Sequence, residues 1–427
     1  MSDYCAIDFG TSNSALAYAT GTGPRLAELE PGFDNMPTAV FVSADDHTRR
    51  YGRDAIGAYV DGLDGRLMRS IKSILGSDLM DETTEIAPGL AARYVDIVIG
   101  YLRHLRGVAQ TQCGRELKRV VIGRPVFFVD DDGARDAKAQ ETLATAARAA
   151  GFDEVTFQFE PIAAALDYES CVAQERLVLV ADIGGGTSDF SLVRASPARH
   201  AQLDRRDDIL ANHGVHIAGT DFDRAVSLHT IMPALGFGSS GPQGRVVPGS
   251  IYFELATWHL INATYSHARV HELRRMRPMY ADGHLHARLL LVLKKRLGHA
   301  LAAKAEQAKI DVSEHARTRI DLAAIEAGLA VAFDEPQQRA ALERWIERIV
   351  HAADKTVRLA GIAPAAIDAL YFTGGSTGLA YLVERIAARF PRAERVRGNR
   401  FSSVVQGLAI TAQRRFEPHS KVSRQSI

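Results

Sequence analysis

The sequence predicts an α/β protein made of two halves related by duplication. A glycine turn occurs twice, at residues 8–14 and at residues 182–189. Each copy follows an apolar run and precedes an alternating run, which is typical of strand, tight turn, strand. The apolar runs are residues 4–7 and 177–181, and the alternating runs are residues 15–19 and 190–193. We therefore expect one hairpin with a polar tip in each half.

The other predicted elements alternate between strand and helix. Residues 1–60 look rich in strands, and residues 90–110 have the apolar spacing of a helix. Residues 119–125 form a buried strand that Pro125 should end, since proline cannot continue the ladder. An alanine-rich helix over residues 134–150 then precedes a strand over residues 154–159.

The two glycine turns have the chemistry of a phosphate site. Glycine lets the backbone approach an anion and point consecutive N–H groups at it. Carboxylates such as Asp8 and Asp182, which close the strands, can hold a hydrated divalent cation. Either turn alone is equally compatible with a structural hairpin, but the pair indicates a polyphosphate clamp. Hydroxyl donors are also expected from Thr11, Ser12, Thr187 and Ser188.

Glu160 stands where the strand at residues 154–159 meets a helix. Pro161 follows it, at a position where the first helical turn tolerates proline. A carboxylate at a helix start is favoured by the helix dipole and can still accept a proton from water. Taken alone, Glu160 fits an ordinary N-cap better than a catalytic base, and the surrounding motifs reverse this order.

The composition limits the classes of partner. The chain has 427 residues, of which 46% are hydrophobic and 24% charged, as in globular proteins. Its 51 basic residues balance 51 acidic ones, so overall charge favours neither nucleic acid nor an anionic membrane. Three scattered cysteines indicate a reducing compartment, and no apolar run is long enough to span a bilayer. We expect a cytoplasmic protein without nucleic-acid or membrane partners, and no Walker-type P-loop is present.

The order of these motifs resembles the actin-like ATPase superfamily, and specifically the nucleotide-binding domain of the seventy-kilodalton heat-shock (DnaK-type) chaperones. The resemblance runs from residue 3 to about residue 412. Lys72 falls where those chaperones carry a phosphate-contacting lysine, and Pro125 matches a proline that couples nucleotide state to lobe motion, with Arg135 as its partner. The resemblance implies nucleotide contacts from Gly10, Thr11, Ser12, Asn13, Gly184, Gly185, Gly186, Thr187, Gly219, Thr220, Glu306, Lys309, Ser313, Gly374, Gly375 and Ser376.

The resemblance also implies the domain organisation. The expected fold is two-lobed and ribonuclease H-like, each lobe a mixed sheet flanked by helices, with nucleotide in the cleft between lobes. Lobe I would comprise residues 1–171 and 397–427, and lobe II residues 172–396. An enlarged insertion at about residues 225–300, with no C-terminal peptide-binding domain, resembles the short YegD-type members. A protein partner is expected at this insertion.

The implied activity is Mg²⁺-dependent hydrolysis of ATP to ADP by in-line attack of water. Asp8 and Asp182 would hold the Mg²⁺ through water, Thr187 and Glu160 would place the attacking water, and Lys72 would neutralise charge on the γ-phosphate.

Three departures from the family pattern leave a nucleotide-binding regulator with little hydrolysis as the main alternative. They are Ile310 and Gly378 in place of arginines near adenine, and Phe401 in a turn that lacks its usual aspartate. An actin-like small-molecule kinase and a filament-forming scaffold are further alternatives.

Overall fold

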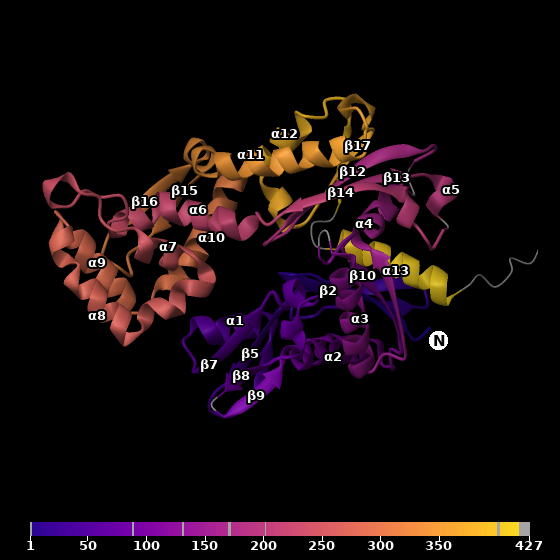
Figure 1. The fold of residues 1–427 in the computed structure, drawn as a ribbon, viewed down its shortest axis with the longest axis horizontal. Coiled ribbons are helices and arrows are strands. Elements are labelled where there is room, and N and C mark those ends of the chain that lie inside the picture. The colour runs from indigo at the N-terminus through magenta and orange to yellow at the C-terminus, as the bar shows by residue number, and fades with distance from the viewer. Residues whose placement is uncertain are drawn as a thin grey trace, which may run out of the picture. The chain divides into compact units, whose positions relative to one another are not determined.

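The structure, a computed structural model, describes residues 2–87, 89–129, 132–169, 172–200, 202–398 and 402–417. The chain forms two compact units. We call Met1–Gly214, Ala352–Gly375 and Ala387–Ile427 the sheet unit, and Val215–His351 with Ser376–Ile386 the helical unit. Mixed sheets flanked by helices confirm the predicted α/β class (Figure 1). The prediction places one mixed sheet in each lobe, whereas the sheet unit contains both large sheets. The boundaries of lobes I and II therefore remain a prediction.

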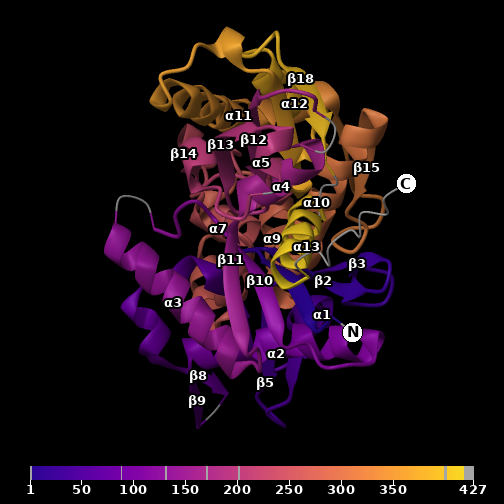
Figure 2. The same ribbon diagram turned by 90° about the vertical axis from the view of Figure 1, so that its right-hand side faces the viewer.

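The first large sheet has the order β11-β10-β1-β2-β3, with β4 pairing with β2. Strands β11, β10 and β1 are parallel, and β1, β2 and β3 are antiparallel. Figure 2 shows β10 and β11 running side by side. The bounds are β1 Tyr4–Phe9, β2 Asn13–Thr20, β3 Gly23–Leu26, β4 Asn35–Pro37, β10 Arg119–Arg124 and β11 Glu154–Phe159.

Alternate residues of β1 build two separate cores, because successive side chains of a strand point to opposite faces. Cys5, Ile7 and Phe9 pack in a cluster with α2 (Tyr94–Cys113) and α3 (Gly133–Ala149). Tyr4 and Ala6 pack in a second cluster with α4 (Glu160–Glu169) and α13 (Ser403–Phe416). Helices therefore cover the first sheet on both faces, and α4 and α13 lie against each other (Figure 1).

The second large sheet has the order β14-β13-β12-β17-β18. Strands β12 and β13 form an antiparallel hairpin, and β17 and β18 continue in parallel from β12. Helix α4 packs on β12 and β13, so it contacts elements of both large sheets. The bounds are β12 Arg176–Ile183, β13 Ser188–Ala195, β14 Ile209–Val215, β17 Ala369–Thr373 and β18 Glu394–Arg397.

Smaller elements complete the sheet unit, and one corrects the sequence prediction. The helix expected over residues 90–110 begins only at Tyr94, because Leu90–Arg93 forms strand β9 and pairs with β8. Pairing in this local hairpin thus overrides the helical spacing there. The bounds of the smaller elements are β5 Ala39–Ser43, β6 Arg49–Tyr51, β7 Gly65–Arg69, β8 Thr83–Ala87, α1 Gly52–Val60 and α5 Pro197–His200.

The helical unit contains the predicted insertion at about residues 225–300. The described regular elements of the helical unit are helices, apart from the hairpin of β15 and β16 and the last residue of β14. Helices α11 and α12 have residues in both units. No helix within the described ranges combines the length and apolar character needed to cross a bilayer. The bounds are α6 Gly219–Thr230, α7 Ser250–Ala256, α8 His267–Arg275, α9 Gly283–Lys294, α10 Gly298–His315, β15 Arg317–Asp321, β16 Ala330–Asp334, α11 Glu335–Leu359 and α12 Ala380–Ala387.

Candidate functional site

Both predicted glycine turns are hairpin tips, and both lie in the sheet unit. In the first hairpin Phe9 pairs with Ser14, which leaves residues 10–13 as the turn. In the second, Ile183 pairs with Ser188, which leaves residues 184–187 as the turn. The turns are therefore equal in length, with Asp8 and Asp182 at equivalent positions just before them. The predicted pattern of strand, turn, strand is confirmed in both copies.

Thr38 fastens the first turn, and sequence reasoning missed it. Its hydroxyl donates to the carbonyl oxygen of Gly10 at 2.8 Å and shares a hydrogen bond with the Ser14 hydroxyl, also at 2.8 Å. Its backbone N–H donates to the Ser12 carbonyl at 2.9 Å. Thr38 is only 3% exposed. A threonine between a proline and an apolar run gives no motif, so sequence offered little signal for this contact.

The second turn is closed by a hydrogen bond of its own. The Gly184 N–H donates to the Thr187 carbonyl at 3.0 Å. Gly374, from the end of β17, lies against the strand that leads into this turn. Its φ is +86°, and a Cβ there would lie 2.4 Å from the Ile183 oxygen and 2.7 Å from Asp182 Oδ1. Only glycine fits at Gly374, so its backbone packs directly against the end of the strand that leads into the second turn.

The two turns approach each other within the sheet unit. A Cβ added at Gly185 would lie 2.6 Å from the Ser12 hydroxyl oxygen. At Gly186, by contrast, a Cβ would meet nothing within 4 Å. The first and second turns are thus neighbours, as the predicted sharing of one anionic ligand requires.

Lys72 and Glu160 form an ion pair, although 88 residues separate them. Lys72 Nζ lies 2.7 Å from Glu160 Oε1, and the side chains are 10% and 15% exposed. Lys72 lies in a short 3₁₀ helix, Ile71–Ile74, that follows Ser70, whose φ of +57° is unusual for a residue other than glycine. Glu160 is the first residue of α4, as predicted. The structure therefore brings together two residues singled out from sequence for separate reasons.

The charges of this cluster are unbalanced. Burial raises the pKa of Asp8 to about 7, and the charge of Glu160 adds to the rise while Lys72 opposes it. Burial, then Asp189, Glu160 and Asp8, raise the pKa of Asp182 to about 8. Burial alone would lower the pKa of Lys72, but Glu160, Asp8 and Asp182 outweigh it and raise that pKa. One ammonium group thus serves three carboxylates, so the cluster favours a further cation.

The remaining predicted nucleotide contacts lie in the helical unit, apart from Gly374 and Gly375 in the sheet unit. Lys309 Nζ pairs with Asp223 Oδ1 at 2.7 Å, and the Ser313 hydroxyl donates to the Lys309 carbonyl at 2.8 Å. Their role in binding a nucleotide stays a prediction, as does that of the other helical-unit residues. These are Gly219 and Thr220 at the start of α6, Glu306 in α10, and Ser376 after Gly375.

The structure describes two of the three residues that depart from the family pattern. Ile310 lies on α10 and is 38% exposed. Gly378 ends the short 3₁₀ helix that begins at Gly375. Phe401 falls outside the described residues. Arg135 donates from Nε to the Gly76 carbonyl at 3.3 Å, and its coupling to Pro125 stays a prediction.

No group of three or more His, Cys, Asp or Glu side chains in the described part of the chain is arranged to hold a metal ion directly. The predicted contacts of Asp8 and Asp182 with Mg²⁺ run through water and stay a prediction. The charge imbalance among Asp8, Glu160 and Asp182 is the observation that fits a hydrated divalent cation.

The family model described as Hsp70 protein matches residues 91–233. The matched segment contains α4 with Glu160, the second glycine hairpin with Asp182, and the start of α6. It does not include the first hairpin or Lys72. Over this segment the chain is similar to Hsp70 proteins, and the finer likeness to YegD-type members stays a prediction.

Proposed function

We propose that this chain is an ATP-binding, chaperone-like protein that hydrolyses ATP slowly with Mg²⁺. The observation that carries the proposal is the Lys72–Glu160 ion pair at 2.7 Å, formed beside two aspartates at the bases of neighbouring glycine turns. The match to the Hsp70 model over residues 91–233 supports the same function.

The proposed chemistry assigns each side chain a task. The backbone N–H groups and hydroxyls of the two turns would bind the phosphates, and Lys72 would neutralise charge on the γ-phosphate. Glu160 and Thr187 would orient the attacking water, since positioning and charge neutralisation dominate phosphoryl transfer. Asp8 and Asp182 would hold a hydrated Mg²⁺, which supplies positive charge next to the phosphates. This ion would also offset the excess of carboxylates over ammonium groups.

The second candidate is a nucleotide-binding regulator that hardly hydrolyses ATP. Ile310 favours it, because an aliphatic side chain cannot replace the stacking of arginine on adenine, which is worth about 1–2 kcal/mol. An actin-like kinase that transfers phosphate to a small molecule is a third candidate, with no observation in the structure that favours it.

We also propose that a protein partner binds the helical insertion at about residues 225–300. A surface hollow of about 510 Å³ is lined by Leu260, Ala263 and Ala268, together with Ser266 and the ion-paired Glu254, Arg269 and Glu272. Phe253 and Leu260 are 47% and 39% exposed. Leu260→Asp should therefore prevent the recovery of partners that the wild-type protein retains, whereas Leu359→Asp, at another exposed leucine, should not. Equal recovery with both variants would exclude this surface.

The proposed function is tested by ATP turnover with Mg²⁺ together with calorimetric binding of ATP and ADP, with Asp8→Asn as the control. Slow hydrolysis that disappears in Asp8→Asn supports the ATPase. Tight binding without hydrolysis favours the regulator. A protein that neither binds nor hydrolyses ATP would contradict both the ATPase and the regulator. Hydrolysis that persists unchanged in Asp8→Asn would contradict the proposed site.

A further inference from the structure

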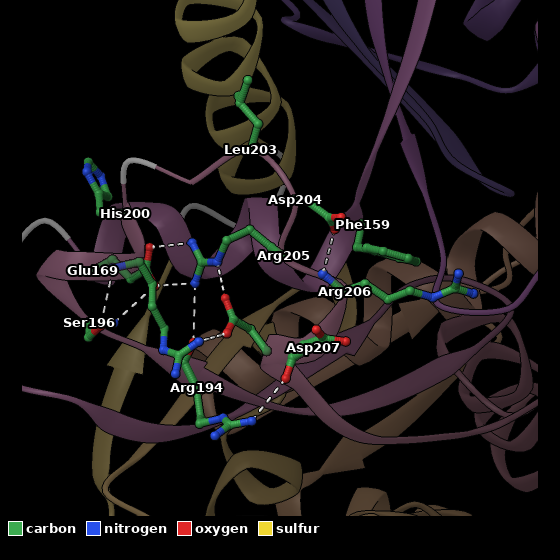
Figure 3. A network of polar contacts seen from close by, with 12 residues as sticks. Phe159, Glu169, Arg194, Ser196, His200, Leu203, Asp204, Arg205, Arg206 and Asp207 are labelled. Carbon is green, nitrogen blue, oxygen red and sulfur yellow. Dashed lines mark hydrogen bonds and ion pairs between the residues drawn. The ribbon is translucent and has the colours of Figure 1, made fainter.

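A buried ion-pair network joins the end of α4 to the connection between β13 and β14. We call the described residues of this connection, 196–200 and 202–208, the β13–β14 connection. Arg205, within it, is paired with Glu169 at the end of α4 (Figure 3). It is also paired with Asp208. The side chains of Arg205, Glu169 and Asp208 are 1%, 1% and 3% exposed. Charged side chains this well buried are uncommon, so their placement requires an explanation.

Glu169 is held from several directions. Arg205 Nη1 donates to Glu169 Oε2 at 3.0 Å, and Nη2 donates to Oε1 at 2.5 Å. The backbone N–H of Ser196 also donates to Glu169 Oε1, at 3.1 Å. The fork of two parallel bonds fixes the carboxylate in orientation as well as position. The last residue of α4 is therefore fixed to the first residue of the connection.

The same connection also contacts the strand that leads into α4. The Gln158 side chain, in a residue only 5% exposed, donates from Nε2 to the Leu203 carbonyl at 3.4 Å. Its Oε1 accepts a hydrogen bond from the Phe159 N–H at 2.8 Å. Gln158 is two residues before Glu160. The connection thus contacts the chain on both sides of Glu160, just before α4 and at its end.

Helix α13 closes the arrangement from another side. A Cβ at Gly407 would lie 1.9 Å from the Ala163 carbonyl, so α13 contacts the backbone of α4 directly. Arg414, further along α13, donates to the carbonyl and to the ring of His200 in the connection. Helix α4 therefore has little freedom to move along its axis or to rotate.

Stability alone is a weak explanation for this network. Replacing a buried ion pair by apolar residues of similar volume is often neutral or stabilising, because removing charges from water is costly. What the network adds is a fixed position for α4, whose other end carries Glu160 and the bond to Lys72.

We propose that Arg205, acting through Glu169, is a positioning residue for Glu160. By fixing the end of α4, it sets the depth and rotation at which Glu160 meets Lys72. This inference rests on the proposed function, because Glu160 matters catalytically only if the site hydrolyses ATP.

A double-mutant cycle in turnover tests the proposal. Arg205→Met should lower kcat about tenfold to a hundredfold with KM nearly unchanged, because small misplacement of a catalytic group is that costly. In a Glu160→Gln background the same change should have no further effect. Glu160 and Glu169 are about 14 Å apart along the helix, so independent effects would simply multiply. The proposal would be overturned if the fold-losses in kcat of Arg205→Met and Glu160→Gln multiplied in the double variant. It would also be overturned if Arg205→Met changed KM alone.

A matched control and a charge-free variant guard against misfolding. Arg194→Met removes another guanidinium of the same region, whose Nη2 donates to the Asp207 carbonyl at 3.1 Å, and should leave kcat unchanged. The double variant Glu169→Met/Arg205→Met removes both charges, and Asp208 keeps its ion pair with Arg199, so no buried charge is left unpaired. It should fold and still show the lowered kcat. Wild-type kcat in this folded double variant would overturn the proposal.

Hydrogen exchange separates this proposal from the proposed function. Amides of α4 should exchange at least tenfold faster in Glu169→Met/Arg205→Met than in the wild type, while those of α3 stay the same. This measurement needs no turnover, so it remains decisive if the wild type proves not to hydrolyse ATP. Unchanged exchange in α4 would overturn the positioning role of Arg205, whatever the activity of the protein.

Discussion

The two glycine hairpins share a length and a preceding aspartate, but they are held differently. The first is fastened by Thr38, a residue outside the hairpin, which bonds Gly10 and Ser14. The second is closed by the bond from Gly184 to Thr187. The first turn is also tighter, because a Cβ at Gly10 would lie 2.2 Å from the Asn13 oxygen. At Gly184 the nearest such atom would be 3.8 Å away. A duplicated motif can thus keep its shape through different contacts, and the copies should respond differently to substitution.

The largest effect is expected for Lys72, the side chain that lies within electrostatic reach of the aspartates of both hairpins. The aspartates of both copies raise the pKa of Lys72, after Glu160. Lys72→Ala should keep nucleotide binding and lose about 10²–10³-fold in turnover, since it removes one preorganised charge. Lys138→Ala, at a lysine that pairs with Asp78 on the surface, is the matched control. Steady-state kinetics with calorimetry measures both, and unchanged turnover in Lys72→Ala would remove it from the catalytic residues.

The next effect distinguishes the turns directly. Gly10→Ala should destabilise the protein by about 1–3 kcal/mol, because the new Cβ would meet backbone that cannot move aside. Gly184→Ala, at the equivalent position, should cost much less. Urea denaturation of the two variants measures the difference. Equal losses of stability would show that the two turns are equivalent after all.

A smaller effect is expected from the external contact of the first hairpin. Thr38→Val keeps the shape of the side chain but removes its bonds to Gly10 and Ser14, at a cost of about 1–2 kcal/mol. ATP affinity should fall with it, because Gly10 belongs to the predicted phosphate turn. The control is Thr111→Val, whose exposed hydroxyl bonds only its own helix. If Thr38→Val matched this control in thermal denaturation and calorimetry, the first turn would not depend on Thr38.

The smallest expected effect is the difference in pH dependence between the two aspartates. A carboxyl group with a raised pKa binds more protons folded than unfolded, so stability falls as pH rises from about 4 towards the folded value. The folded values are about 7 for Asp8 and about 8 for Asp182. Between pH 7 and 8 the loss should therefore come mainly from Asp182, and should be at most about 1.4 kcal/mol.

Asp182→Asn should therefore flatten the stability profile of the nucleotide-free protein between pH 7 and 8, and Asp8→Asn should flatten it mainly below pH 7. Chemical denaturation at several pH values measures both profiles. Stability that rises with pH over this range in the wild type would contradict the assignment.

Local features of the site were predictable from sequence, and contacts between distant segments were not. The hairpins follow from the spacing of glycine between an apolar and an alternating run, and the start of α4 follows from Pro161. The Lys72–Glu160 bond joins residues 88 positions apart, and their pairing could not be derived from spacing. No sequence motif marks Thr38 or Arg205, because their importance arises from contacts with residues distant in the sequence. Leu90 is a different case, because its strand partner, Ala87, lies only three positions away and the helical spacing of residues 90–110 concealed this local hairpin.

The close contact between α13 and α4 has a consequence for synthesis of the chain. Val405, Leu408 and neighbouring residues of α13 cover the face of the first sheet formed by Tyr4 and Ala6. Because α13 is the last helix among the described residues, a ribosome completes it after every strand of that sheet. The part of this face that α13 covers is thus exposed through most of translation, and such surfaces aggregate readily. The first sheet therefore completes its core only after α13 has left the ribosome.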